Sequence, residues 1–238
     1  MIVGCCGTAG RTLEMYSKYL DAVEIQSTFY KMPKRETVLS WRNRVPKGFI
    51  FTMKAFQGIT HPSDSPTWRR YRKLIENIDE SEVGMLVDSE FVHKAWEETI
   101  SIARELKAEA IVVQLPPSFS YTHENLQKVM KLPYRIFKLA VEFRHKSWFG
   151  NISKISERLN KMGGVVVWDP LKFGNIRQRT YYYRLHGKNG FTNYKYCYSE
   201  EEIRKLYDYC REKNGFVFFN NVKMWENALM LKSLMSQS

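Results

Sequence analysis

The chain has 238 residues, of which 44% are hydrophobic and 14% aromatic, and its 37 Lys and Arg against 25 Asp and Glu give a formal net charge of +12. This composition excludes a disordered segment, a collagen-like fibre and a small disulfide scaffold, and we expect one globular domain over residues 1–238. No apolar run approaches the roughly 18 residues of a membrane span, so we expect no membrane partner. The first residues lack a signal-peptide pattern, which favours the cytoplasm.

Short apolar runs alternate with longer amphipathic segments along the whole chain. The apolar runs predict eight strands, at residues 2–7, 22–28, 49–55, 110–116, 137–143, 164–169, 181–187 and 215–221. Apolar residues spaced three and four apart predict helices at residues 12–20, 36–44, 91–106, 123–131, 152–162, 200–213 and 225–235. The stretch after Asp169 is too short and too rich in Pro and Gly to predict a helix. Continuous rather than alternating apolar runs are typical of parallel strands covered by helices.

Eight strand-then-helix units in a chain of about 250 residues predict a (β/α)8 barrel of the TIM type. The alternative is an open doubly wound sheet, which would normally carry a GxGxxG turn after its first strand. Residues 4–12 resemble that turn only loosely. Residues 61–90 interrupt the rhythm, so we expect an elaborated loop after the third strand that covers part of the barrel mouth. Within it, residues 84–88 could form an extra strand.

Polar side chains stand at the C-terminal end of every predicted strand, where a parallel barrel places its active site. We expect catalytic roles for Glu24, Lys54, Glu142, Asp169 and His186. We expect substrate contacts from Thr8, Tyr30, His61, Gln114, Arg144, Trp148, Arg184, Lys188 and Asn221. For Glu24, a structural ion pair with Lys54 or Arg184 is an equally good interpretation.

Residues 142–148 bring a carboxylate, a guanidinium, an imidazole and an indole to the end of the fifth strand. By strand alternation Glu142 and Arg144 face the mouth, while Phe143 packs against the helices. Arg144 can hold an anion by its planar fork, and Glu142 can act as a base or pair with another cation. Trp148 supplies a stacking surface or caps the next helix.

The seventh strand ends in His186 and runs into a flexible loop that contains Lys188. TIM barrels frequently bind phosphate after strands seven and eight, so we expect an anion near His186 and Lys188.

Two mechanistic assemblies fit these residues. In one, Glu24, Glu142, Asp169 and His186 bind a divalent metal that activates water or polarises a carbonyl. In the other no metal is present, Lys54, Arg144 and Arg184 neutralise a phosphate or carboxylate, and Glu142 or His186 transfers a proton. The interleaved cations favour the assembly without a metal, so we expect no metal cofactor.

The cysteines show no metal or redox spacing. Cys5 and Cys6 are adjacent, and Cys197 and Cys210 are isolated. Without a CxxC pair, we expect small buried thiols.

The sequence resembles the YecE-like proteins, the domain of unknown function 72, over essentially its whole length. The likeness rests on VEIQSTFY (23–30), FTMKAFQGITHP (51–62), VVQLPPSF (112–119), VEFRHKSW (141–148), YRLHGKNG (183–190) and FVFFNN (216–221). It implies a TIM barrel in the neighbourhood of the endonuclease-IV-like and xylose-isomerase-like barrels, with a polar pocket at the strand ends and no known activity. Two departures alter that pocket, because Thr8-Ala9-Gly10-Arg11 replaces a Thr-Ser-Gly-Trp-like block and Gln26 replaces an Asn.

The leading interpretation is an enzyme with hydrolase- or lyase-type acid/base chemistry on a phosphorylated or otherwise anionic small molecule or nucleotide. A nucleic-acid-binding or nucleic-acid-processing protein is an alternative, because the chain is basic and carries the cluster RRYRK (69–73). A partner-binding scaffold with a vestigial pocket is another. The sequence leaves the oligomeric state open.

Overall fold

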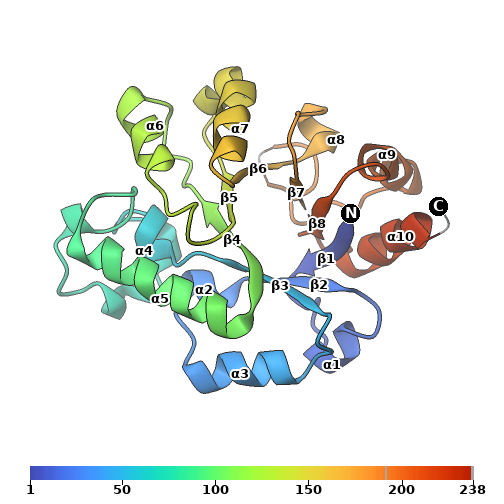
Figure 1. Ribbon diagram of the computed structural model, residues 1–238, viewed down its shortest axis with the longest axis horizontal. Helices are drawn as coiled ribbons and strands as arrows, with labels where there is room; N and C mark the ends of the chain where they lie inside the picture. Colours follow the sequence, from blue (N-terminus) through green and yellow to red (C-terminus); the bar gives the residue numbers. More distant parts are fainter. Residues whose placement is uncertain (191, 237–238) are drawn as a thin grey trace.

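The computed structural model describes residues 1–190 and 192–236, and within them eight parallel strands close into a barrel (Figure 1). The strands are β1 (Ile2–Cys6), β2 (Ala22–Ile25), β3 (Ile50–Lys54), β4 (Ala108–Gln114), β5 (Leu139–Glu142), β6 (Val165–Trp168), β7 (Tyr181–Leu185) and β8 (Gly215–Phe219). They pair in chain order, and β8 pairs with β1 from Phe216 opposite Ile2 to Phe219 opposite Cys5. The predicted TIM-type barrel in a single domain is confirmed, and the open sheet is wrong.

Helices surround the strands on the outside (Figure 1). The longer ones are α3 (Arg35–Asn43), α5 (Glu90–Leu106), α6 (His123–Met130), α7 (Ile152–Lys161), α9 (Glu200–Cys210) and α10 (Met224–Ser236). Single turns form α1 (Leu13–Tyr16), α2 (Ser27–Tyr30), α4 (Gln57–Thr60) and α8 (Pro170–Phe173). Short 3-10 helices are η1 (Pro66–Trp68), η2 (Arg72–Leu74), η3 (Glu80–Glu82) and η4 (Lys146–Asn151).

Two short helices differ from the sequence prediction: α2 forms where the second strand is expected to continue, and α8 forms where no helix is expected. The second strand ends at Ile25, because Gln26 has helical dihedrals and is the N-cap of α2. The Thr28 hydroxyl then donates to the Lys54 carbonyl at 2.8 Å, which fixes α2 against β3. After β6, Asp169 accepts hydrogen bonds from the Leu171 and Lys172 N–H groups, so α8 forms where the sequence predicts no helix.

The loop after β3 contains no extra strand at residues 84–88. Gly84, Met85 and Leu86 have φ values of +75°, +50° and +51°, which an extended strand cannot adopt. Their N–H groups donate to the carbonyls of residues 58, 60 and 59 in α4, at 2.8, 3.1 and 3.0 Å. The elaborated loop is therefore built from η1, η2 and η3 and is fastened at its far end by main-chain hydrogen bonds to α4.

The barrel interior is closed below the mouth by a layer of apolar side chains. Tyr182, Phe216 and Phe218 from β7 and β8 contact one another, with the Tyr182 ring centroid 5.7 and 5.4 Å from the other two. Small residues on the opposite strands, Ala22, Ala110 and Ala140, complete this cluster. Gly4 gives the rings room, because a Cβ there would lie 2.9 Å from the Phe218 ring. Above these rings, charged side chains at the strand ends and the Tyr182 hydroxyl form the floor of the mouth.

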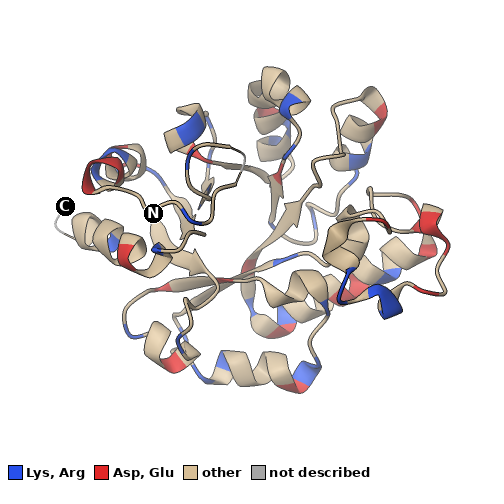
Figure 2. Cartoon of the chain, turned by 180° about the vertical axis from the view of Figure 1, so that it is seen from behind, with Lys and Arg blue, Asp and Glu red and all other residues tan. Residues whose placement is uncertain are grey.

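Charged residues of both signs are interspersed over the outer helices (Figure 2). Among the helices that the structure describes, none combines the length and apolarity of a membrane span. The thiols of Cys5, Cys6 and Cys210 are buried, whereas Cys197 is exposed, which corrects its predicted burial.

Candidate functional site

A cavity of about 430 Å³ opens at the C-terminal mouth of the barrel. The strand ends contribute Lys54, Gln114 and Arg184, and the residues that follow strands contribute Gln26, Arg144 and Asn220. Phe29, Tyr30, Thr67 and Tyr194 complete its wall. Of the predicted site residues, the structure brings Tyr30, Lys54, Gln114, Arg144 and Arg184 together around this one space.

Arg184 forms a buried ion-pair network beneath the cavity. Its Nη2 lies 2.9 Å from Glu24 Oε1, and its Nη1 donates to Glu142 Oε2. Tyr182 Oη donates to Glu24 Oε2 at 2.7 Å and lies 2.8 Å from the Thr52 hydroxyl. We call Glu24, Glu142, Tyr182 and Arg184 the floor network. Since Arg184 and Glu24 have side chains only 1% and 0% exposed, removal of one partner would leave an uncompensated charge in the barrel interior.

Glu142 is an anchor for arginines and a poor proton acceptor. Arg144 approaches its second oxygen through Nε and Nη2, both at 3.3 Å. Burial alone would raise the pKa of Glu142, but the positive charges of Arg144 and Arg184 outweigh it and hold that pKa well below its ordinary value. A carboxylate with such a low pKa is a weak base, so the predicted role of Glu142 as a general base is not supported by its surroundings.

Lys54 stands apart from the floor network. Its Nζ lies 3.6 Å from the centroid of the Phe29 ring, and among the described residues it forms no ion pair. Burial lowers the pKa of Lys54 from 10.5 to about 7, and the nearby charges of Arg184 and Arg144 act in the same direction. Lys54 can therefore exchange a proton near neutral pH.

The two predicted histidines are buried and neutral. Burial and the charge of Lys54 lower the pKa of His61 to about 3, and its Nδ1 lies 2.8 Å from the Thr60 hydroxyl. The His61 ring packs edge-on against Phe29 and does not line the mouth cavity. Burial and Arg184 lower the pKa of His186 well below its ordinary value, and its Nε2 has no hydrogen-bond partner in the described chain.

His186 and Asp169 line a separate crevice of about 30 Å³ beside the floor network, together with Glu142 and Arg184. Burial raises the pKa of Asp169 from 3.8 to about 7, although Lys172 lies 4.0 Å away. Asp169 also caps α8 through its other oxygen. The crevice is too small for a substrate, so these groups lie behind the mouth cavity rather than in it.

Three other predicted contacts also lie outside the mouth cavity. Trp148 is fully buried, and its Nε1 donates to the Phe119 carbonyl at 2.7 Å, so it is a core residue. Asn221 donates to the Tyr196 carbonyl and to Asn227 Oδ1, and the neighbouring Asn220 lines the cavity instead. Lys188 pairs with Glu202 and lines a different hollow of about 480 Å³.

Thr8 does not line the cavity either, nor do the neighbouring residues of the divergent block, and Arg11 of this block packs on α10. Arg11 donates to the Ala9 carbonyl at 2.8 Å, and its guanidinium lies 3.9 Å from the centroid of the Trp225 ring. By contrast, Gln26 does line the cavity and donates to the Glu24 carboxylate. Of the two sequence departures, only Gln26 therefore alters the cavity wall.

The predicted metal ligands do not form a metal site. Arg184 lies between Glu24 and Glu142 and bonds to both, so a guanidinium takes the position between the carboxylates that a cation would need. Within residues 1–190 and 192–236, no group of three or more His, Cys, Asp or Glu side chains is placed to hold a metal ion. The residues of the floor network therefore do not fit a divalent metal.

The sequence alone does not single out Thr67 and Tyr194, which complete the cavity wall from long loops. Strand alternation accounts for Asn220, because every second residue of β8 points inward, and Phe216 and Phe218 face the barrel interior.

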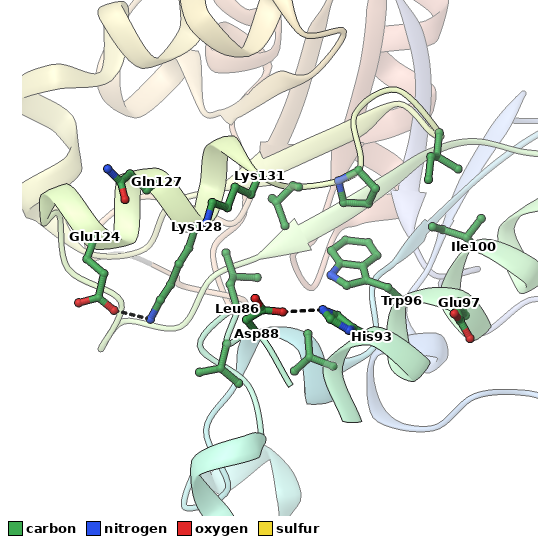
Figure 3. A pocket seen from close by; sticks show the side chains of 15 residues that line it. Leu86, Asp88, His93, Trp96, Glu97, Ile100, Glu124, Gln127, Lys128 and Lys131 are labelled. Atoms are coloured by element: carbon green, nitrogen blue, oxygen red, sulfur yellow. Dashed lines mark ion pairs between the residues drawn. The ribbon is translucent and has the colours of Figure 1, made fainter. Parts of the chain in front are cut away.

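Another hollow, of about 500 Å³, lies between α5 and α6, and it shares no lining residue with the mouth cavity (Figure 3). Trp96 and Ile100 of α5 line it together with Leu132 and Pro133. Two ion pairs lie at its edges, His93 with Asp88 at 2.8 Å and Lys128 with Glu124 at 2.9 Å (Figure 3). Its mainly apolar lining lies away from the strand ends, so we do not assign it to the candidate site.

The closed barrel and the ionic pocket at its mouth define a protein of the TIM-barrel class. The family model described as "Protein of unknown function DUF72" matches residues 6–238, and the chain therefore belongs to the DUF72 family. This confirms the resemblance seen in the sequence blocks.

Known relatives agree with this assignment. The chain is 23% identical to the UPF0759 protein YunF of Bacillus subtilis (strain 168) over 252 residues, which cover 89% of this chain and 80% of YunF. It superposes on a DUF72 family protein from Enterococcus faecalis V583 with a TM-score of 0.74 and 22% identity, covering 100% of this chain and 96% of the other. Endonuclease IV from Thermus thermophilus gives a TM-score of 0.56 at 13% identity, covering 100% and 97%. These likenesses show the fold alone.

Proposed function

We propose that this protein is an enzyme that binds a phosphorylated or otherwise anionic small molecule in the mouth cavity and transfers a proton through Lys54. The observation that carries the proposal is the position of Lys54, a buried amine that lines the cavity and has no carboxylate partner in the described chain. A buried ammonium without a counter-charge is costly. An anionic ligand would supply that counter-charge.

The charge balance of the mouth supports the same proposal. Among the described residues, Lys54, Arg144 and Arg184 have two ion-pair partners between them, Glu24 and Glu142, which leaves one positive charge in excess while Lys54 is protonated. Arg144, with a side chain 14% exposed, is the guanidinium that solvent and ligand can reach. Its planar fork suits a phosphate or carboxylate.

The roles divide between the two cations. Arg144 binds and orients the anion, and Lys54 gives or takes the proton, because its pKa of about 7 makes both protonation states accessible near neutral pH. Glu142 holds Arg144 in place. This division supports hydrolase- or lyase-type acid/base chemistry.

Calorimetric titration with sulfate tests the anion site, because the charge of sulfate does not change near neutral pH. We expect affinity to fall as the pH rises through about 7, since Lys54 loses its proton there. Lys54→Gln should abolish binding, and Lys54→Arg should bind sulfate without this pH dependence because arginine stays charged. Lys161→Gln, at an exposed lysine of α7, is the matched control.

Incubation of the protein with a cell extract tests for catalysis. We expect mass spectrometry to detect the consumption of an anionic metabolite by the wild type but not by Lys54→Gln. Unchanged sulfate binding in Lys54→Gln would show that the proposed site is wrong.

A further inference from the structure

An outer hollow of about 560 Å³ adjoins the mouth cavity. Tyr30 and Thr67 line both spaces, so the two are neighbours across these side chains. The rest of the hollow is lined by the loop after β3, through Pro66, Arg69, Arg70 and Tyr71. A ligand that fills the mouth cavity can therefore extend past Tyr30 toward this loop.

Two tyrosines form an aromatic surface at the junction. The rings of Tyr30 and Tyr71 are stacked, with centroids 5.8 Å apart and an angle of 25° between their planes. Tyr30 is 39% exposed although it belongs to a well-packed helical turn. A solvent-accessible stacked pair of this kind can extend its stack with the planar ring of a ligand.

The two arginines of the outer hollow are not paired within the described part of the chain. Arg69 and Arg70 are exposed, and their side chains form no hydrogen bond or ion pair with any residue that the structure describes. Arg72, in the same basic cluster, instead donates to the Ser63 carbonyl and pairs with Glu80 at 3.4 Å. The basic cluster thus divides into an arginine that fixes the loop and two that are available to a ligand.

We propose that the outer hollow is a second subsite, and that the substrate is a nucleotide unit with a phosphate on each side of the nucleoside, as in a phosphorylated dinucleotide. This rests on the proposed function. One phosphate occupies the mouth cavity at Lys54 and Arg144, the base stacks on the Tyr30–Tyr71 pair, and the second phosphate meets Arg69 and Arg70. Aromatic stacking flanked by phosphate-binding cations is a general pattern for single-stranded nucleic acid. A mononucleotide would leave one of the two cation pairs without an anion.

Calorimetry with inorganic phosphate, thymidine monophosphate and a phosphorylated thymidine dinucleotide tests this order of groups. We expect affinity to rise along the series. Arg70→Ala should weaken the dinucleotide about tenfold, a change of about 1.4 kcal/mol, and leave inorganic phosphate unchanged. Tyr71→Ala should weaken both nucleotides by a similar factor. Lys73→Ala is the matched control, because Lys73 belongs to the same basic cluster but does not line the hollow.

The outcomes separate this proposal from the proposed function. Equal affinities for the three probes, all lost in Lys54→Gln, would overturn the second subsite and leave the anion site standing. Failure of every probe to bind would overturn both. Dinucleotide binding that is lost in Arg70→Ala but undiminished in Lys54→Gln would place the ligand outside the cavity and contradict a substrate that spans both spaces.

Discussion

The floor and the rim of the barrel mouth use the same kinds of charged residue in different ways. In the floor network, Arg184 pairs with two carboxylates that are themselves bonded to further groups. At the rim, the Lys54 ammonium lies over the Phe29 ring, and Lys54, Arg69 and Arg70 form no ion pair with any residue that the structure describes. The difference teaches that the residue type alone does not distinguish a cation of the barrel interior from one that is available to a ligand, because the partners of each cation decide this.

Removal of the floor cation should give the largest effect. Arg184→Met leaves Glu24 and Glu142 buried beside each other without a guanidinium, so we expect the free energy of unfolding to fall by about 3–5 kcal/mol. Urea denaturation measures this change. A companion variant that combines Arg184→Met with Glu24→Gln and Glu142→Gln should recover most of the loss. Wild-type stability of Arg184→Met alone would mean that the floor carboxylates are solvated.

Replacement of the rim cation should change stability in the opposite direction. Lys54→Met removes a buried ammonium, and we expect the free energy of unfolding to rise by about 2 kcal/mol near pH 6. The folded pKa is about 7 and the ordinary value 10.5. The unfolded chain therefore holds an extra proton between these values, and wild-type stability should increase with pH across that range.

Urea titrations at several pH values compare the two curves. The stability of Lys54→Met should lack this increase, and the curves should converge above about pH 10. Parallel curves would contradict a buried, unpaired Lys54.

Asp169, in the crevice behind the floor, extends the comparison to a buried carboxyl group whose pKa is raised. Its folded pKa is about 7 against an ordinary 3.8, so the folded state holds a proton that the unfolded chain has lost, and wild-type stability should fall as the pH rises between these values. Asp169→Asn keeps the cap of α8 but carries no charge. We expect it to exceed the wild type by about 2 kcal/mol near pH 8 and to match it near pH 4. A variant that loses stability equally at both pH values would show that the carboxylate is not penalised by burial.

Lys188 should give the smallest effect. Its partly exposed ion pair with Glu202 contributes little, so Lys188→Gln should cost less than about 0.5 kcal/mol. Sulfate affinity should not change, because Lys188 does not line the mouth cavity. A large loss of sulfate affinity would move the anion site to the loop after β7.

The sequence predicts those site residues that stay in strand register, and it fails where the chain leaves that register. Arg184 and Glu142 alternate with residues that face the helices, so their inward direction follows from the strand pattern. Trp148 lies in η4, where strand parity no longer applies, and an indole there packs into the helical layer. Asn221 lies two residues beyond the end of β8 and donates to Asn227 Oδ1, whereas Asn220 keeps the inward direction of Phe216 and Phe218.

The sequence also does not show which cations form ion pairs with carboxylates. Lys54 and Arg184 are both cations at inward-facing positions near the end of a strand, and the sequence alone predicts an anion-binding role for each. Their difference arises because Glu24 and Glu142, from β2 and β5, converge on the guanidinium of β7, while Phe29 fills the space beside the ammonium. Only the closure of the barrel brings these distant segments together.

The main-chain fastening of the β3 loop to α4 has an evolutionary consequence. The hydrogen bonds of residues 84–86 use N–H groups and carbonyls, so they do not depend on which side chains the loop carries at its tip. The exposed Arg69 and Arg70 and the half-buried Tyr71 can therefore be exchanged without altering where the loop is attached. Substitutions in this short stretch would change the lining of the outer hollow, while the barrel and the anchorage of the loop stay the same.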